Sequence, residues 1–317
     1  MITGLEVAAP PTPRPMLNIW LALMIAIPAG STAVLFIKAS HMPALWLAAS
    51  RLLIAALIIL PLALRDQRLS MVRWTRRDLV LAVIPALALS VHFALWIVGA
   101  RLTNAVDASL IGNLLPVALP IVVFLMLREL PSRRELAACV IGICGIVGMG
   151  LVAARHGGVH EARGDVLCGL SLIGVAVYLA MARRLRRGSL WIYLVPIYGF
   201  AGLFCALLAW CFQGPPQVPH GRELLLVLGL AVIPTVIAHS IYNRAMTELR
   251  PNVLGVLNLL QCPLAGAAAW LLWNEHPSPG FYVASCAAVA AFAVLMYPVL
   301  AARLVARQRT AQGPTPA

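Results

Sequence analysis

Hydrophobic stretches of about 20 residues recur along this chain from Leu17 to Leu300, separated only by short Arg-rich or Pro/Gly-rich connections. A bilayer core about 30 Å thick is crossed by about 20 helical residues. Because lipid offers the backbone no hydrogen-bond partners, only helices and closed barrels can span it. The pattern predicts an all-α integral membrane protein whose function resides between its helices.

The composition agrees with this class. Hydrophobic residues make up 62% of the 317 residues and charged residues 11%, too few charges for the surface of a soluble domain. The net charge of +13 comes from arginines in the connections, so we expect lipid and a small-molecule substrate as partners, but no nucleic acid. The seven cysteines form no Cys-x-x-Cys pair or Cys/His cluster, so neither a metal site nor a cofactor is expected.

Hydropathy windows of about 19 residues predict ten transmembrane helices. The tails 1–16 and 302–317 are expected to be disordered. The ten predicted spans are 17–38, 43–64, 79–100, 105–127, 134–154, 165–184, 189–212, 223–245, 252–273 and 280–301.

The distribution of Lys and Arg predicts the orientation. Of the 24 such residues, 18 lie on the side of the two termini and five on the other, while Arg51 lies within the second span. Cytoplasmic connections carry the excess of positive charge. We therefore expect a multi-pass protein of the cell (inner) membrane with both termini in the cytoplasm.

The two halves, 17–154 and 165–301, have related sequences. Each half contains five predicted spans, an odd number, so the second half must be inserted upside down relative to the first. Inverted five-helix repeats are a transporter architecture, with substrate bound near the midplane where the repeats meet. An offset of 146 to 149 residues aligns Pro85 with Pro234, His92 with His239, Pro116 with Pro263, and Glu129–Ser132 with Glu275–Ser278.

The four aligned prolines are candidate helix kinks. Pro85 and Pro234 fall in spans three and eight, and Pro116 and Pro263 fall in spans four and nine. Proline removes a backbone hydrogen bond and bends a helix. The freed carbonyls either face water in a cavity, or the prolines serve packing and bending alone; both interpretations stay open.

Several short stretches occur in an order and spacing that resemble a known family. The first, Ile27–Ala33, is close to a Trp-Gly-Ser/Thr pattern but lacks its tryptophan. On these stretches the chain resembles the drug/metabolite transporter superfamily, specifically its EamA-like ten-helix branch. The stretches are Ile27–Ala33 (IPAGSTA), Ala49–Ala56 (ASRLLIAA), Asp107–Leu110 (DASL) with Pro116 and Arg128-Glu129, Gly164–Leu167 (GDVL), Tyr178–Ala180 and Arg183–Leu185.

This resemblance implies a bundle in which spans one to four and six to nine surround a central cavity, with spans five and ten at the periphery. It favours efflux of a small metabolite, but it does not give the substrate, because relatives move amino acids, sugars, nucleotides and drugs. Small residues in the peripheral spans either pack within one subunit or form a homodimer contact. They are Gly142, Gly145, Gly148 and Gly150 in span five, and Ser285–Ala288 with Ala290 and Ala291 in span ten.

Polar groups inside the spans are costly in lipid and are therefore candidate substrate contacts. Arg51 is expected to attract a substrate carboxylate or phosphate, or else to clamp backbone carbonyls or extend its charged end outward to the membrane surface. His92 and His239 occupy pseudo-symmetric depths, where an imidazole relays protons or simply forms a hydrogen bond. Asn113 and Asn258 bind an amide, hydroxyl or zwitterion, or else bond between helices. The remaining candidate contacts are Gln261, Trp96, Tyr178 and Tyr242.

The acidic residues are all peripheral. All eleven carboxylates lie in tails, connections or span ends, so the sequence offers no mid-membrane Asp or Glu as a proton carrier. Uniport and exchange are therefore at least as well supported as proton coupling. Glu129 and Glu275, at opposite membrane faces, are candidate gates, with a solvated helix end as the alternative interpretation.

A secondary transporter of a polar or amphipathic metabolite is the leading prediction. The alternative, an intramembrane enzyme, requires paired aspartates, His-Glu-x-x-His or a serine with its histidine base; none is found in the spans, so no catalytic residue is assigned. The sequence also lacks the Gly-x-x-x-x-Gly-Lys motif of ATP-driven pumps. A non-transporting membrane scaffold is a further alternative.

Overall fold

The computed structural model describes residues 17–153, 159–186, 188–273 and 279–311. Every regular element in these ranges is a helix, which confirms the all-α prediction. The expected N-terminal tail 1–16 lies outside the described residues, as do residues 312–317.

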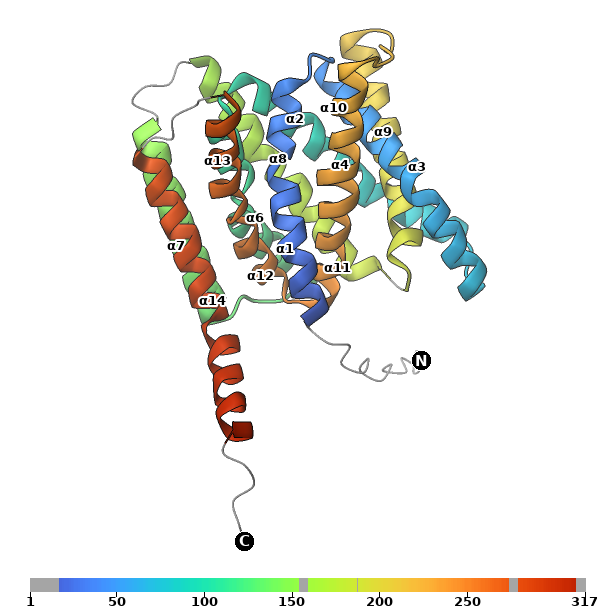
Figure 1. Ribbon diagram of the computed structural model, residues 1–317. Helices are drawn as coiled ribbons and strands as arrows, with labels where there is room; N and C mark the ends of the chain where they lie inside the picture. The colour runs from blue at the N-terminus through green and yellow to red at the C-terminus, as the bar shows by residue number, and fades with distance from the viewer. Residues whose placement is uncertain (1–16, 154–158, 187, 274–278, 312–317) are drawn as a thin grey trace.

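The helices follow one another with short connections (Figure 1). One segment, η1, is a π-helix, in which the backbone hydrogen bonds span five residues. The elements are α1 Leu17–Ser31, α2 Ala33–Ala39, α3 Ala44–Ser70, α4 Arg76–Leu102, α5 Ala105–Gly112, α6 Leu115–Leu127, α7 Arg133–Ala153, α8 Val159–Leu185, α9 Leu190–Gln213, α10 Arg222–Leu230, η1 Ala231–His239, α11 Ser240–Glu248, α12 Pro251–Asn258, α13 Gln261–Trp273 and α14 Pro279–Ala311.

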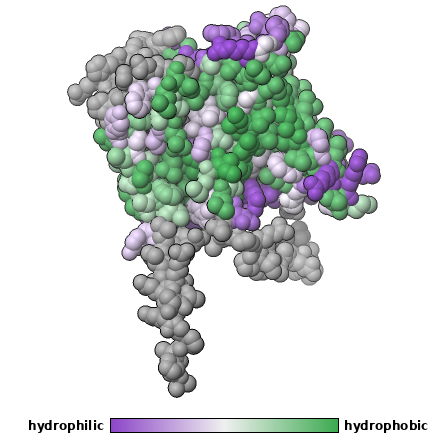
Figure 2. Space-filling model, in the orientation of Figure 1, coloured by the Kyte–Doolittle hydropathy of each residue, from purple (hydrophilic) through white to green (hydrophobic). Residues whose placement is uncertain are grey.

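Eight helical segments within the described ranges are long and apolar enough to cross a membrane, by length and composition. On the face shown in Figure 2, apolar residues cover the body of the bundle and hydrophilic residues gather toward its ends. Helices α7 and α14 are not among the eight, and the apolar segment of α14, Phe281–Tyr297, is shorter than these. The exact count of ten spans therefore stays a prediction.

Three predicted spans are interrupted rather than continuous. Span one breaks between α1 and α2 at Thr32, span four between α5 and α6, and span nine between α12 and α13. The breaks in spans four and nine occupy corresponding positions of the two halves: α5 ends at Gly112 and α12 at Asn258. Irregular backbone at membrane depth is tolerated only where protein or a water-filled cavity surrounds it. The paired breaks therefore predict a cavity next to them.

Helix packing follows the two-fold relation expected of the halves. Helix α4 packs along α8, and its counterpart is the packing of η1 and α11 against α1. The pairs α3 with α9 and α7 with α14 each join a helix to its own counterpart, and spans four and nine meet through α6 with α12 and α5 with α13. The interior between the two halves is therefore built from both.

Two glycines allow α4 and α8 to approach closely. A methyl group on Gly99 would lie 2.8 Å from the backbone nitrogen of Cys168, and one on Gly164 would lie 2.8 Å from the carbonyl oxygen of Gly99. No side chain fits at either position without backbone movement. Close approach through small residues is the usual means of helix packing in membranes, where lipid is as apolar as the side chains.

Helices α7 and α14 lie against each other at one edge of the bundle (Figure 1). Two of the small residues in α7 pack within the subunit, Gly142 against Leu259 and Gly145 against Ala284 and Ala287. A homodimer contact remains a prediction. Helix α14 continues past the expected span end at 301 to Ala311, because the segment ARLVARQRTA contains many residues of high helix propensity.

Candidate functional site

A cavity lies between the two halves at the paired helix breaks. Its volume is about 80 Å³, enough for several water molecules. Its walls come from α1 to α6 of the first half and from α8, η1, α11, α12 and α13 of the second. Eight of the nine candidate substrate contacts line it: Arg51, His92, Trp96, Asn113, His239, Tyr242, Asn258 and Gln261.

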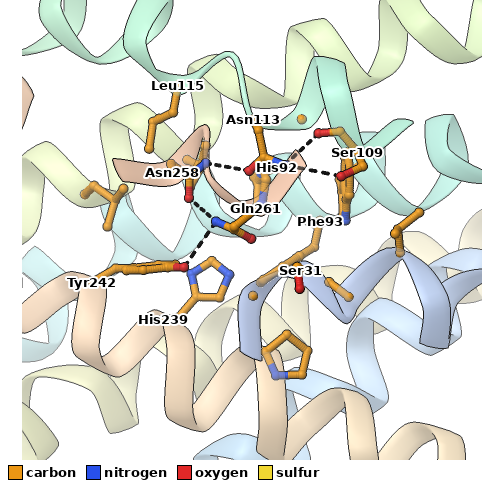
Figure 3. A pocket seen from close by; sticks show the side chains of 18 of the residues that line it. Ser31, His92, Phe93, Ser109, Asn113, Leu115, His239, Tyr242, Asn258 and Gln261 are labelled. Carbon is orange, nitrogen blue, oxygen red and sulfur yellow. Dashed lines mark hydrogen bonds between the residues drawn. The ribbon is translucent and has the colours of Figure 1, made fainter. Parts of the chain in front are cut away.

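A chain of polar side chains crosses the cavity from one half to the other (Figure 3). Asn258 Nδ2 donates to Asn113 Oδ1 at 2.8 Å, and Gln261 Nε2 donates to Asn258 Oδ1. Gln261 also donates to the Tyr242 hydroxyl at 3.1 Å, and Tyr242 donates to the carbonyl of Ala26 at 2.9 Å. The chain therefore links both helix breaks to α11 and α1, and a ligand in the cavity meets amide and hydroxyl groups already oriented by one another.

The Arg51 guanidinium is fully buried at the wall of the cavity. Its Nε and Nη2 donate to Thr235 Oγ1 at 3.0 and 2.8 Å, and its Cζ lies 4.0 Å from the centre of the Phe93 ring. Thr235, which lies in the π-helix η1, donates its own hydroxyl hydrogen to the backbone carbonyl of Leu230 at the end of α10. The arginine of the first half is thus held by a hydroxyl of the second.

His92 and His239 lie near one another, with ring centres 6.4 Å apart. Nδ1 of His92 lies 3.0 Å from the carbonyl of Ser171, so this nitrogen carries the hydrogen and Nε2 remains an acceptor. Nδ1 of His239 is buried and has no hydrogen-bond partner among the described residues. The Phe93 ring lies 5.4 Å from His239. Both imidazoles therefore have one ring nitrogen free to bond a cavity occupant.

Two predicted aromatic contacts have different surroundings. Trp96 lines the cavity and packs over Gly112, where a methyl group would lie 2.2 Å from the indole ring. Tyr178 is fully buried and does not line the cavity; its hydroxyl accepts from Asn243 Nδ2 at 2.5 Å and lies 3.5 Å from the Tyr198 hydroxyl. Tyr178 is thus placed behind the cavity wall.

The four prolines also differ in position. Pro116 and Pro263 stand in the first turns of α6 and α13, where the missing N–H is tolerated, and the helix breaks precede them by two to three residues. Pro234 lies inside η1 and lines the cavity, whereas α4 continues without interruption past Pro85. Pro263 borders a separate apolar groove of about 500 Å³ between α1, α13 and α14.

One predicted gate residue belongs to a network at one end of the bundle. Glu129 pairs with Arg183 Nε at 2.9 Å, at the end of α8. The Arg183 Nη1 group donates to the carbonyls of Met246 and Leu249 at 2.9 and 3.0 Å, at the end of α11. Helices α6, α8 and α11 are thereby fastened together. The second predicted gate residue, Glu275, lies outside the described residues.

A corresponding network closes the opposite end. Lys38, at the end of α2, donates to the carbonyl of Thr103 after α4. Arg101 donates to the carbonyls of Met42 and Ser40 at 2.5 and 3.1 Å. Lys38 and Arg183 each end the first span of their half and each bond carbonyls at the end of the third. Sequence reasoning missed this pairing, although the two residues are related by nearly the repeat offset.

Sequence reasoning also missed Thr235 and Phe93, which hold Arg51. Threonine and phenylalanine in an apolar span carry no charge signal. The only sequence indication was the neighbouring pair Pro234 and His239, which brackets Thr235 in a segment already aligned with the first half.

Two halves packed around a cavity with polar side chains from both and with paired helix breaks form the architecture of a membrane transporter. The EamA-like transporter family matches this chain twice, at residues 16–151 and 162–297. The chain therefore belongs to the EamA-like transporter family.

Two relatives and a solved structure are among the proteins that are similar to the chain. The uncharacterized transporter YetK of Bacillus subtilis (strain 168) is 24% identical over 242 residues, 74% of this chain and 73% of YetK. A probable biotin transporter of Pseudomonas aeruginosa is 32% identical over 82 residues, only 25% of this chain and 29% of that protein. A crystal structure described only as that of a protein matches with a TM-score of 0.71 and 21% identity, over 88% of this chain and 97% of its own, which supports the fold alone.

Proposed function

We propose that this protein is a secondary transporter that moves a small polar or amphipathic metabolite across the cell (inner) membrane by alternating access. The observation that carries the proposal is the cavity between the halves, to which both halves contribute polar side chains. A polar cavity at membrane depth costs free energy in an otherwise apolar bundle. The binding and release of a polar cargo would give this costly cavity a function.

The two end networks supply the gates in this proposal. On one side Arg183 fastens α8 to α11 and to Glu129, and on the other Lys38 and Arg101 fasten the α2–α3 connection to α4. Breaking one network while keeping the other would open the cavity to one side only. Because the networks sit at pseudo-symmetric positions, the two open states would have comparable free energies, as a carrier requires.

The cargo and the direction belong to this proposal as well. The hydrogen-bonding groups of the cavity suit an amino acid-like or other polar compound, or a drug of mixed polarity. We favour efflux, because of the family resemblance. The match to the probable biotin transporter covers a quarter of this chain and therefore does not transfer its substrate.

The test is transport by the purified protein in liposomes. Vesicles are incubated with an isotopically labelled mixture of amino acids, monosaccharides, monocarboxylates and organic amines, and the contents are measured by mass spectrometry. Saturable uptake that is accelerated by unlabelled compound inside the vesicles is expected of a carrier. Protein-free liposomes serve as the control. Chemical conversion without net movement would instead indicate an intramembrane enzyme, and neither activity would indicate a scaffold.

A further inference from the structure

The charge of Arg51 is not balanced within the cavity. Among the described residues that line it, Arg51 is the one permanently charged group, and none is an aspartate or glutamate. The ion pairs Arg183–Glu129, Arg244–Glu248 and Arg250–Glu135 lie near helix ends at one side of the bundle, away from Arg51. A buried charge without a partner is strongly destabilising. An anion in the cavity would relieve this cost.

The hydrogen-bonding groups of Arg51 point to the same occupant. A guanidinium has five N–H groups and no acceptor. Here two of them share one hydroxyl oxygen, Thr235 Oγ1, whose two lone pairs are then filled. Nη1 is buried without a hydrogen-bond partner in the described part of the chain. A structural clamp would place several carbonyls around the guanidinium, whereas this arrangement orients the group and leaves donors unused.

The remaining polar groups of the cavity lining do not change the sign of its net charge, which is positive because of Arg51. Asn113, Asn258, Gln261 and Tyr242 are neutral and largely bond one another. At the two breaks, the C-termini of α5 and α12 and the N-termini of α6 and α13 meet at the cavity, and their opposite partial charges largely cancel. Arg51 therefore sets the charge preference. An ammonium group would find no carboxylate in the described lining.

We propose that the transported metabolite is a monoanion, a small carboxylic acid without a compensating ammonium group, and that its carboxylate binds the unused N–H groups of Arg51. The proposal rests on the proposed transport function and narrows its substrate class. The carboxylate would accept a fork of two parallel N–H···O bonds, which arginine favours over lysine. The uncharged part of the molecule would lie against Trp96 and bond the Asn258–Gln261–Tyr242 chain.

The first experiment uses the wild-type protein in liposomes with pairs of probes of nearly equal size. Butyrate, lactate, benzoate and nicotinate are each compared with their primary amide, and alanine and choline represent zwitterions and cations. We expect saturable counterflow within the carboxylate set and little with the amides, alanine or choline. Saturable counterflow confined to amides, zwitterions or cations would overturn the monoanion while leaving the carrier intact. Absence of counterflow with every probe and with the broad metabolite mixture would contradict the transport function itself, and the inference with it.

Variants then test the role of Arg51 on whichever carboxylate is transported. Arg51→Lys keeps the positive charge but cannot form the two parallel N–H···O bonds, and we expect the half-saturation concentration to rise about tenfold. Arg51→Gln loses both the charge and these bonds, and we expect a rise of about 100-fold or more. Thr235→Val, which removes the hydroxyl that orients Arg51, should give an intermediate rise. Arg163→Gln, at an exposed arginine, is the matched control and should behave as wild type.

Two measurements separate a folding defect in the Arg51 variants from a binding defect. They are the midpoint temperature of thermal unfolding and the ratio of carboxylate to amide counterflow. If Arg51→Gln folds and transports the carboxylate with unchanged half-saturation, the arginine has only a structural role and the proposal is wrong. If Arg51→Gln does not fold, Arg51→Lys and Thr235→Val decide the question through the ratio of carboxylate to amide counterflow. An unchanged ratio in both would overturn the proposal.

Discussion

Asn113 and Asn258 bond to each other across the centre of the molecule, with Nδ2 of Asn258 2.8 Å from Oδ1 of Asn113. Each stands at the end of the first half of a broken helix, and the two helices occupy corresponding positions of the two repeats. The halves are therefore joined by side chains that are themselves counterparts. Movement of one half against the other must turn about this bond or break it.

This bond should be measurable as a coupling free energy. We expect Asn113→Ala and Asn258→Ala each to destabilise the protein, and the double variant to cost about 1 kcal/mol less than the sum of the two. Unfolding in detergent mixtures gives the three values. A second cycle between Asn258 and the exposed Asn18 should be additive. Additivity in both cycles would show that the contact contributes nothing to stability.

The network at Arg183 should hold one end of the bundle closed. In Arg183→Met the ion pair with Glu129 and two carbonyl bonds are lost, worth about 1 to 3 kcal/mol together. In this variant, a cysteine placed in the cavity by Ser31→Cys should react severalfold faster with a membrane-impermeant thiol reagent added on the side of Arg183. Arg244→Met removes an exposed pair with Glu248 and should change nothing. Lys38→Met should instead accelerate labelling from the opposite side of the membrane. Faster labelling from the same side in both variants would refute the gate assignment.

Close packing of α4 against α8 should make one glycine far more sensitive than another. Gly99→Ala places a methyl group 2.8 Å from backbone atoms of α8 and should destabilise the protein by about 1 to 3 kcal/mol. Gly199→Ala, in α9, meets open space and should be neutral or stabilising by up to about 1 kcal/mol. Thermal midpoints of the two purified variants check this. Equal midpoints would contradict the packing.

The predicted topology can be checked by labelling single cysteines in intact cells. Arg76→Cys and Arg184→Cys should be protected from an impermeant reagent, because both lie at the side of the termini, whereas the exposed Gln217→Cys should be labelled. Permeabilised cells provide the control, in which all three should react. Labelling of Arg76→Cys and Arg184→Cys from different sides would exclude the inverted repeat.

Replacement of His92 should affect transport more than stability. His92→Ala removes a ring that lines the cavity and bonds the carbonyl of Ser171, so we expect at least a tenfold loss of counterflow rate. Cys139→Ala, a buried residue of α7 away from the cavity, should retain the rate of wild type at equal abundance in the vesicles. Equal rates in the two variants would remove His92 from the site.

The sequence was sufficient to predict the class, the family and the relation between the halves. Hydropathy averaged over about 19 residues is a strong signal, because lipid leaves few alternatives for the backbone. The repeat offset aligned His92 with His239, and the structure brings these rings to 6.4 Å from each other. The prolines indicated the interrupted spans four and nine but not the position of the breaks, which precede Pro116 and Pro263.

Only the tertiary structure decided which polar residue faces which partner. Successive residues of a helix point about 100° apart, so depth in the membrane does not determine direction. Tyr178 and Tyr242 are equally plausible in the sequence, yet one packs behind the wall and the other faces the cavity. The partner of Arg51 is a threonine 184 residues away, in a π-helix that no periodicity indicated. The hydrophobic composition alone indicates that lipid surrounds this protein. Which residues line its cavity depends on the long-range packing of one half against the other.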